Sequence, residues 1–235
     1  MTTSQFTTVD PSFQSEERTR SYYRWRAGRY DKVTTYEIEH HREAIQLADI
    51  QPGDRVLEVA CGTGRATVEL ASRLGADGRL DALDLSEAML GHAQRKVAER
   101  GLLNKVELKI GSAQVLPYPS QTFDILYNSY MFDLIAVTQF KSILEEFKRV
   151  LKPGGKMILV NMSKDTSRKT LYERVYEIAR LFPCRPVAME SYVREAGFAD
   201  AQRIYRNSYT RSMLLPFGTE IVTARKALKW LMVSK

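Results

Sequence analysis

The sequence predicts a doubly wound α/β fold with a mostly parallel sheet. Short apolar runs that are typical of buried strands alternate with helical segments along the chain. These runs are nearly continuous rather than alternating, as in strands that are covered on both faces of a sheet. A length of 235 residues, 44% of them hydrophobic and 27% charged, is sufficient for one α/β domain with a substantial core.

The first elements follow a break in the chain at "QPGD" (51–54). Before the break, an apolar stripe at helical spacing predicts a helix over 36–50. After it, "RVLEVA" predicts a strand over 55–60. A helix over 65–74 follows, and it closes near Gly75.

The next elements have clear start and stop signals. "GRLDALDL" (78–85) contains a strand that ends at Asp84. Ser86 has the position of an N-cap for a helix that runs to about residue 100, where Gly101 is a natural stop. "VELKI" (106–110) alternates as a strand.

The second half of the chain continues the alternation. "TFDILYNS" (122–129) contains a strand, and apolar residues at helical spacing predict a helix over 140–151. "KPGGK" (152–156) is expected to be a turn that leads into a strand over 157–162. The remaining expected elements are helices near 170–182 and 189–196 and strands near 201–206 and 219–225.

The ends and the composition set the domain organisation. Residues 1–20 are predicted to be a polar N-terminal arm and residues 21–235 a single domain. The sequence shows no apolar run of about 20 residues and no signal-peptide pattern, and its two cysteines, Cys61 and Cys184, cannot form a disulfide framework. We therefore expect a cytoplasmic protein without a resident metal.

The net charge of +7 is concentrated near the C-terminus. Residues 161–235 carry 14 basic against 7 acidic residues, whereas the rest of the chain is balanced. This excess is either a solvated surface or an attraction to anionic lipid or to an acidic substrate. The apolar and basic stretch 224–235, with Trp230 at its centre, is the candidate for a weak peripheral membrane contact, and docking on the protein's own sheet is an equally good explanation.

Candidate ligand-binding residues lie at the carboxyl ends of the predicted strands, where doubly wound sheets bind ligands. The first strand ends in "ACGTG" (60–64), whose glycines let a ligand approach the backbone closely. The dinucleotide fingerprint G-x-G-x-x-G fails because position 67 is Thr67. Asp84 lies 20 residues after Gly64 and can accept both hydroxyls of a ribose. The pattern indicates a nucleoside that is bound without the usual grip on a diphosphate.

Four stretches resemble class I S-adenosylmethionine-dependent methyltransferases, most closely the menaquinone/ubiquinone-biosynthesis C-methyltransferase-like group of the methyltransferase domain 11 type. They are "VLEVACGTG" (56–64), "DALDLSEAML" (81–90), "GSAQVLPYPSQTFDILYNS" (111–129) and "LEEFKRVLKPGGKMILV" (144–160). Less specific likeness extends the resemblance over about residues 22–226. It implies a Rossmann-like sheet of seven strands with the last strand antiparallel, S-adenosyl-L-methionine as cofactor, and methyl transfer to a small molecule, a quinone or a lipid headgroup.

The resemblance also implies a set of cofactor contacts. Glu58 would reach the amino-acid end of the cofactor, Asp84 the ribose hydroxyls, and Leu85 and Met89 the adenine. Glu58, Met89 and Tyr30 also have purely structural explanations as buried or packed residues. The full implied set is Tyr30, Glu58, Ala60, Gly62, Gly64, Asp84, Leu85, Met89, Ser112, Ala113, Gln114 and Asn128.

One position departs from the family pattern. The family often has Asp after the glycine at 111, where its carboxylate contacts the adenine amino group, and this chain has Ser112. A hydroxyl still forms a hydrogen bond there, but a charge-assisted bond is lost. Backbone groups of Ala113 and Gln114 are expected to compensate in part.

The catalytic residues are less well defined than the cofactor site. Asp133 follows the fourth strand and is the leading candidate for a general base, ahead of His40 or His41 and of His92. An aromatic wall that holds the acceptor is expected from residues that otherwise form a packed N-terminal cap: Tyr22, Tyr23, Trp25 and Tyr130. His40 is included among the substrate contacts.

Other functions remain open. A natural-product enzyme that binds the cofactor without transferring a methyl group has the same fold requirements. An amino methyltransferase of nucleic acids would carry Pro-Pro-aromatic after the fourth strand, where this chain has "NSYM" (128–131), so we expect no nucleic-acid partner. A dehydrogenase is disfavoured by Thr67.

Overall fold

The computed structural model describes residues 15–34, 37–165, 168–179, 184–208 and 217–228. The described strands are β1 Arg55–Val59, β2 Arg79–Asp84, β3 Val106–Ile110, β4 Phe123–Ser129, β5 Leu151–Ser163, β6 Phe198–Ser208 and β7 Phe217–Lys226. The described helices are α1 Glu16–Val33, α2 Glu37–Ala48, α3 Arg65–Arg73, α4 Glu87–Glu99, the 3-10 turn η2 Val137–Gln139, α5 Phe140–Val150, α6 Leu171–Ala179 and α7 Glu190–Glu195.

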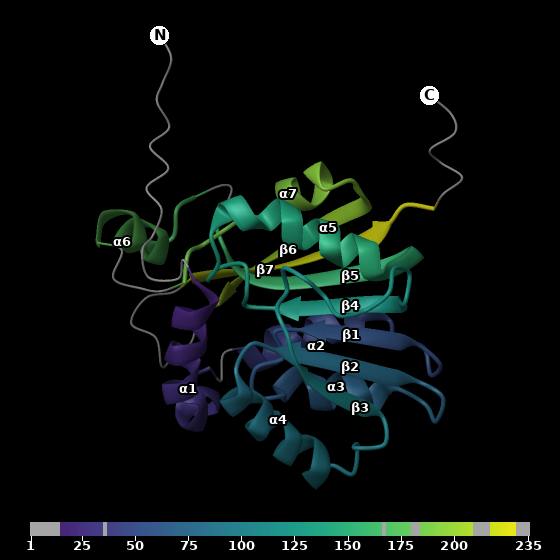
Figure 1. The fold of residues 1–235 in the computed structure, drawn as a ribbon. Helices are drawn as coiled ribbons and strands as arrows, with labels where there is room; N and C mark the ends of the chain where they lie inside the picture. The colour runs from purple at the N-terminus through teal and green to yellow at the C-terminus, as the bar shows by residue number, and fades with distance from the viewer. Residues whose placement is uncertain (1–14, 35–36, 166–167, 180–183, 209–216, 229–235) are drawn as a thin grey trace.

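The strands form one sheet in the order β3-β2-β1-β4-β5-β7-β6 (Figure 1). The pairs from β3 through β5 are parallel, and β7 is antiparallel to both β5 and β6. The predicted doubly wound, mostly parallel sheet of seven strands with an antiparallel last strand is therefore confirmed. The strand order reverses between β1 and β4, so the ligand-binding end of such a sheet lies at the carboxyl ends of these strands.

Two layers of helices bury the faces of the sheet. Helices α5 and α7 pack on one face around Phe132, Phe140 and Phe147. Helices α2 and α3 pack on the other face, where Val56 and Tyr127 are fully buried. Side chains of a strand alternate between faces, so each of these strands contributes apolar groups to both cores, which explains the unbroken apolar runs in the sequence.

The segment "KPGGK" differs from its predicted turn. It belongs to β5, which begins at Leu151, because Phe123 pairs with Leu151 and Ile125 pairs with Lys156. The strand β4 advances two residues while β5 advances five, so the additional residues form a bulge, with Gly154 at φ +77°. The glycines correctly indicated an irregular backbone at this point, but the prediction that the strand begins only at residue 157 was wrong.

Helix α1 lies across the end of the sheet toward which the arrow of β4 points (Figure 1). It begins at Glu16, so the predicted boundary of the N-terminal arm at residue 20 falls inside a helix, and residues 1–14 lie outside the described part of the chain. Ser15 caps the helix by accepting a hydrogen bond from the amide of Arg18 at 3.3 Å. The capping residue and the two glutamates after it are the sequence signal that could have predicted this helix.

Candidate cofactor and acceptor site

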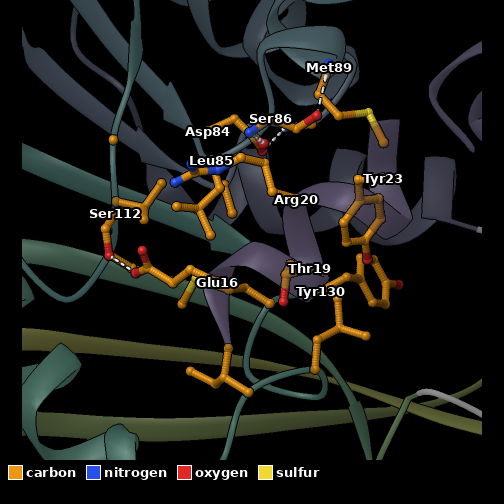
Figure 2. A pocket seen from close by; sticks show the side chains of 18 of the residues that line it. Glu16, Thr19, Arg20, Tyr23, Asp84, Leu85, Ser86, Met89, Ser112 and Tyr130 are labelled. Carbon is orange, nitrogen blue, oxygen red and sulfur yellow. Dashed lines mark hydrogen bonds between the residues drawn. The ribbon is translucent and has the colours of Figure 1, made fainter. Parts of the chain in front are cut away.

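A large cavity lies between the carboxyl ends of the strands and α1 (Figure 2). It encloses about 960 Å³ of space between protein atoms, part of it open to solvent. The loops after β1, β2, β3 and β4 and five side chains of α1 contribute to its wall. Of the predicted cofactor residues it is lined by Tyr30, Ala60, Gly62, Asp84, Leu85, Met89, Ser112, Ala113 and Gln114.

Asp84 ends β2 at the cavity wall. One carboxylate oxygen accepts a hydrogen bond from the amide of Gly62 at 2.9 Å, and the other accepts from the amide of Ser86 at 2.8 Å. Burial raises the pKa of the Asp84 carboxyl, and hydrogen bonds from the backbone amides of Ser86, Gly62 and Leu85 oppose the rise. A carboxylate has about four acceptor sites, so acceptor capacity remains for a ligand hydroxyl while the side chain is held in place by the backbone.

The glycine-rich loop after β1 has one side open to the cavity and one side packed. Ala60 and Gly62 line the cavity with φ of +59° and +56°, and a Cβ added at Gly62 would meet no atom within 4 Å. Gly64 has φ +80° and lines neither this cavity nor the smaller cavity that adjoins it. A Cβ added to it would lie 2.8 Å from Cα of Ala93 in α4. Gly64 thus allows α3 and α4 to pack closely, and its predicted contact with the cofactor stays a prediction.

A smaller cavity adjoins the first and shares Tyr30, Ala60, Gly62, Ser129 and Tyr130 with it. Glu58 projects from β1 into this space and is 1% exposed. Its Oε2 atom has no hydrogen-bond partner among the described residues. Burial raises the pKa of Glu58 to about 8, a hydrogen bond with Thr67 opposes the shift, and the negative charge of Asp84 adds to it. A buried carboxyl group without an ionic partner in the described chain, beside a cavity, fits a ligand that brings a cation.

A polar network fixes the C-terminal part of α1 over this smaller cavity. Asp31 forms an ion pair with Lys96 of α4 at 2.5 Å and accepts a hydrogen bond from the Thr63 hydroxyl at 2.6 Å. Arg65, the first residue of α3, donates to the backbone carbonyls of Asp31 and Thr34. The helix is thereby tied to the glycine-rich loop, to α3 and to α4.

The histidines occupy three different environments. His41 lines the smaller cavity, where its Nδ1 lies 2.7 Å from the hydroxyl of Tyr127 and its Nε2 lies 3.8 Å from Glu37. His40 is buried and lines neither of these two cavities, and its predicted contact with the acceptor stays a prediction. His92 lies on α4 beside Arg95, with its ring nitrogen 3.2 Å from that guanidinium, outside both cavities.

Ser112 does not face the large cavity as a free hydroxyl. Its oxygen accepts a hydrogen bond from the amide of Gln114 at 3.0 Å, and its proton is donated to the carboxylate of Glu16 in α1 (Figure 2). Sequence reasoning missed Glu16, Thr19 and Arg20 as wall residues because it placed them in the polar arm.

The aromatic wall is smaller than expected. Tyr23 and Tyr130 line the large cavity, and Tyr130 has a left-handed backbone with φ +49° at the end of β4. Tyr22 packs edge-on against Tyr23, with ring centroids 5.2 Å apart, and lines neither cavity. Trp25 is 81% exposed and is excluded from the wall. Helix α1 turns only part of its aromatic set toward the sheet, because residues 23 and 30 lie on one helical face.

The end of β4 carries two buried polar residues that the two cavities do not reach. The amide of Asn128 donates to the carbonyl of Val59 at 2.8 Å, which joins β4 to β1, and its predicted contact with the cofactor stays a prediction. Asp133 is 2% exposed, and burial raises its pKa to about 7. Its backbone carbonyl accepts from the amide of Arg185 at 2.8 Å, and Asp133 lines neither of the two cavities.

The described residues contain neither a metal site nor a membrane-spanning helix. In the described ranges no group of three or more His, Cys, Asp or Glu residues has the geometry of a metal site, and both cysteines are free thiols. No described helix has the length and hydropathy needed to cross a membrane.

Geometry and comparison with known proteins agree on the class of protein. A doubly wound sheet with a carboxylate at the end of β2 and an open glycine loop at the end of β1 is an arrangement with which such folds bind nucleosides. Residues 56–155 match the family model described as "Methyltransferase domain". This part of the chain is therefore similar to methyltransferase domains, and the resemblance recognised from its motifs is confirmed.

Two curated relatives make the likeness more specific. A demethylmenaquinone methyltransferase of Bacillus mycoides is 37% identical over 156 residues, which are 64% of this chain and 65% of that protein. A ubiquinone/menaquinone biosynthesis C-methyltransferase of Hydrogenovibrio crunogenus is 39% identical over 145 residues, which are 60% of this chain and 56% of that protein. The alignments thus span less than two thirds of the length of these relatives.

Solved structures show the same fold at low sequence identity. The 4+2 cyclase SpnF is 18% identical with a TM-score of 0.73, and the match covers 93% of this chain and 98% of that one. An S-adenosylmethionine-dependent methyltransferase of Methanosarcina mazei is 21% identical with a TM-score of 0.64, covering 79% and 98%. These likenesses establish the fold alone.

Proposed function

We propose that this protein transfers a methyl group from S-adenosylmethionine to a small lipophilic acceptor of the quinone class. The observation that carries the proposal is the pair of acids at adjoining cavities. Asp84 is held by backbone amides and has acceptor sites to spare, and Glu58 is buried with an oxygen unpartnered in the described chain. A ribose fits the first acid and an ammonium group fits the second.

The residues present fit the cofactor along its length. Asp84 would hold the ribose, and Ala60 and Gly62 leave room for the ligand beside the backbone. Glu58 lines the smaller cavity on the far side of that loop and would hold the amino-acid end. The cofactor supplies an activated methyl group on a cationic sulfur, so the protein mainly has to align the acceptor with it.

The acceptor would enter the larger cavity beside the end of β4. Tyr23, Tyr130, Met131 and Leu134 line that part of the wall and suit a flat, apolar ring. The names of the curated relatives refer to the same class of acceptor, and we propose the class for this chain on both grounds. Asp133 lines neither cavity, so its proposed role as base would be exerted through a neighbouring group.

The structure describes only part of the stretch 224–235, for which a peripheral membrane contact was predicted. Residues 229–235, with Trp230, lie outside the described part of the chain. Lys226 belongs to β7, and its ammonium group donates to the carbonyl of Leu151 at 2.6 Å. This lysine is therefore engaged by the fold, and any attraction to anionic lipid would rest on other basic residues.

The experiment that tests the proposal measures turnover and binding separately. The protein is incubated with S-adenosylmethionine and a demethylmenaquinone-type naphthoquinol, and formation of S-adenosylhomocysteine is followed together with the methylated product. We expect turnover that requires the quinol. Tight cofactor binding without turnover on any quinol would contradict methyl transfer and favour a cofactor-binding enzyme of another reaction class. Failure to bind either cofactor form would reject the whole proposal.

A further inference from the structure

The hydrogen bond between Ser112 and Glu16 brings a carboxylate to one side of the large cavity. Ser112 follows β3, and Glu16 is the first residue of α1, 96 positions earlier in the chain. Both residues line the cavity, and Leu85 lies between this pair and Asp84 (Figure 2). A negative charge therefore lies close to the position where the sequence has no acid of its own.

The orientation of a bound nucleoside follows from the order of the strands. If Asp84 holds the ribose, the two ends of the ligand extend in opposite directions along the edge of the sheet. Glu58 and the smaller cavity lie on the β1 and β4 side, which suits the cationic amino-acid end. The base must then point toward the loop after β3, where Ser112 and Glu16 are placed.

The hydrogen bonds at Ser112 and Glu16 determine which of these side chains can still bind the base. The Ser112 hydroxyl proton is used by Glu16, and the Ser112 oxygen already accepts from the amide of Gln114. Ser112 is therefore a poor direct partner for an amino group. Among the described residues, the Glu16 carboxylate has a hydrogen bond only from Ser112, which leaves further acceptor sites on its two oxygens.

We propose that Glu16 supplies, from helix α1, the carboxylate that recognises the exocyclic amino group of adenine, and that Ser112 positions it. This inference rests on the proposed function, since it requires an adenosyl cofactor in the large cavity. An amino group donates to a carboxylate in a charge-assisted bond, whereas a carbonyl oxygen at the same place is repelled by it. Glu16 would thus compensate for the missing acid at 112 and make α1 part of the selectivity for adenine.

The test compares two ligands that differ at this edge of the base, where the inosyl ligand also carries a proton on the adjacent ring nitrogen. S-adenosylhomocysteine carries the amino group, and S-inosylhomocysteine carries a carbonyl oxygen in its place. Affinities of both ligands are measured by calorimetry for the unmodified protein, Glu16→Ala, Ser112→Ala and the control Glu17→Gln, a neighbouring exposed acid of the same helix. We expect a preference of about 30-fold for the adenosyl ligand in the unmodified protein and in the control, since polar groups left unpaired discriminate strongly.

Glu16→Ala should reduce the preference to within about threefold, and Ser112→Ala should reduce it partly, because the carboxylate loses its positioning bond. The double variant Glu16→Ala with Ser112→Asp should restore a preference of about tenfold, since the acid is then supplied directly from the β3 loop. A purely structural role of Glu16 in docking α1 would weaken both ligands equally and leave the ratio unchanged.

The outcomes separate this inference from the proposed function. A full preference retained in Glu16→Ala, while the protein binds the adenosyl ligand normally, would overturn the role of Glu16 and leave the cofactor site intact. An unmodified protein that binds neither ligand would instead reject the proposed function. Thermal unfolding of Glu16→Ala, compared with that of Glu17→Gln, checks that the variant is folded.

Discussion

The two halves of the site, the cavity wall on the β1–β2 side and the buried groups around the end of β4, satisfy their polar groups in different ways. On the β1–β2 side, Asp84, Asp31 and Thr63 have hydrogen bonds to the backbone or to charged side chains. At the end of β4, Asp133 and Asn128 are buried, and in each of them one side-chain oxygen is without a hydrogen-bond partner in the described chain. The first half is preorganised for a ligand of fixed shape, whereas the second is mostly apolar toward the cavity and sets fewer constraints on what enters.

Glu58 lies between these two halves and shares one property with each, burial with the β4 half and access to a cavity with the β1–β2 half. It lies on β1, next to Ala82 of β2 and Tyr127 of β4 in the sheet register. It is buried like Asp133 near the end of β4, yet it lines the smaller cavity, where a cation can neutralise it. Substitutions on each side, and at Glu58 itself, can therefore test whether the two halves serve different parts of the reaction.

Substitutions in the glycine-rich loop should have the largest effects, and the two variants Gly64→Ala and Gly62→Ala should differ clearly from each other. Gly64→Ala places a Cβ 2.8 Å from the backbone of Ala93 at a left-handed φ, so we expect a loss of about 2–4 kcal/mol in the free energy of unfolding. Gly62→Ala has open space around its Cβ, and its left-handed φ should cost about 1–2 kcal/mol.

Cofactor binding should rank these two variants in the opposite order. Gly62→Ala fills ligand space and should weaken binding of S-adenosylhomocysteine per folded molecule more than Gly64→Ala does. Denaturant unfolding and calorimetric titration of both variants provide the comparison. Equal binding losses in the two variants would show that the loop does not have one ligand side and one packing side.

Asp84→Asn tests the preorganised half directly. The change keeps the shape but removes the charge that would accept ribose hydroxyls, so S-adenosylhomocysteine affinity should fall by roughly 2–3 kcal/mol. Asp81→Asn is the matched control, because Asp81 is a buried acid of the same strand that instead pairs with Arg55 at 3.4 Å. Calorimetry should separate the two, and an unchanged affinity in Asp84→Asn would contradict the ribose assignment.

Much of this half could be predicted from the sequence. Strand ends, the glycine loop, the Ser86 cap and Asp84 depend on local patterns, and the structure has them where they were expected. Glu16 and Arg65 could not be placed in this way, because their contacts join segments 96 and 31 residues apart in the chain. The end of β4 was the hardest part, since whether Asn128, Asp133 and His40 face a cavity depends on how α1 and α2 pack against the sheet, which no local pattern reports.

Glu58→Gln tests the group between the halves through pH. The pKa of Glu58 is raised from 4.5 to about 8 by burial, so the free protein holds it mostly protonated at pH 7. Binding of an ammonium group favours the ionised form, and the affinity for S-adenosylhomocysteine should therefore rise by about tenfold between pH 6 and 8, with proton release. Titrations in buffers of different ionisation enthalpy measure that release, which Glu58→Gln should abolish.

The stability of the ligand-free protein should change in the other direction. A carboxyl group whose pKa is raised on folding stabilises the fold below its unfolded pKa, and this contribution is lost as the pH rises through the folded value near 8. Glu58→Gln should thus have a higher Tm than the unmodified protein at pH 8 and a smaller difference at pH 5. The reverse order would mean that Glu58 already has a cationic partner.

Asp133→Asn tests the less constrained half. If Asp133 acts through a wall group such as Tyr23, kcat should fall by about tenfold, with little change in S-adenosylmethionine affinity. Burial places the pKa of Asp133 at about 7, so kcat should rise through that pH in the unmodified protein, and the variant should lose this dependence. A variant with the same kcat and pH profile would leave the acceptor half with positioning alone.

The smallest effect is expected where the preorganised half is fixed by a partly exposed ion pair. Burial works against ionisation of Asp31, but hydrogen bonds from Lys96 and Thr63 outweigh it and lower its pKa. A lowered pKa gives stability that is present above the unfolded value and is lost as the pH falls through the folded one. Because Asp31 is partly exposed to solvent, Asp31→Asn should cost less than about 1 kcal/mol of global stability.

Asp31→Asn should change the local stability of α1 more clearly than the global stability of the protein. Asp31 holds the end of α1 against Thr63 and Lys96, so Asp31→Asn should raise hydrogen exchange in α1 while leaving β1 and β4 unchanged. Glu39→Gln, a change of an exposed acid on α2, is the control. Bound S-adenosylhomocysteine should restore protection of α1 in the variant if the helix contacts the ligand. Protection that stays unaffected by the ligand would mean that α1 is held by the fold alone and that the cofactor half of the wall ends at the strand loops.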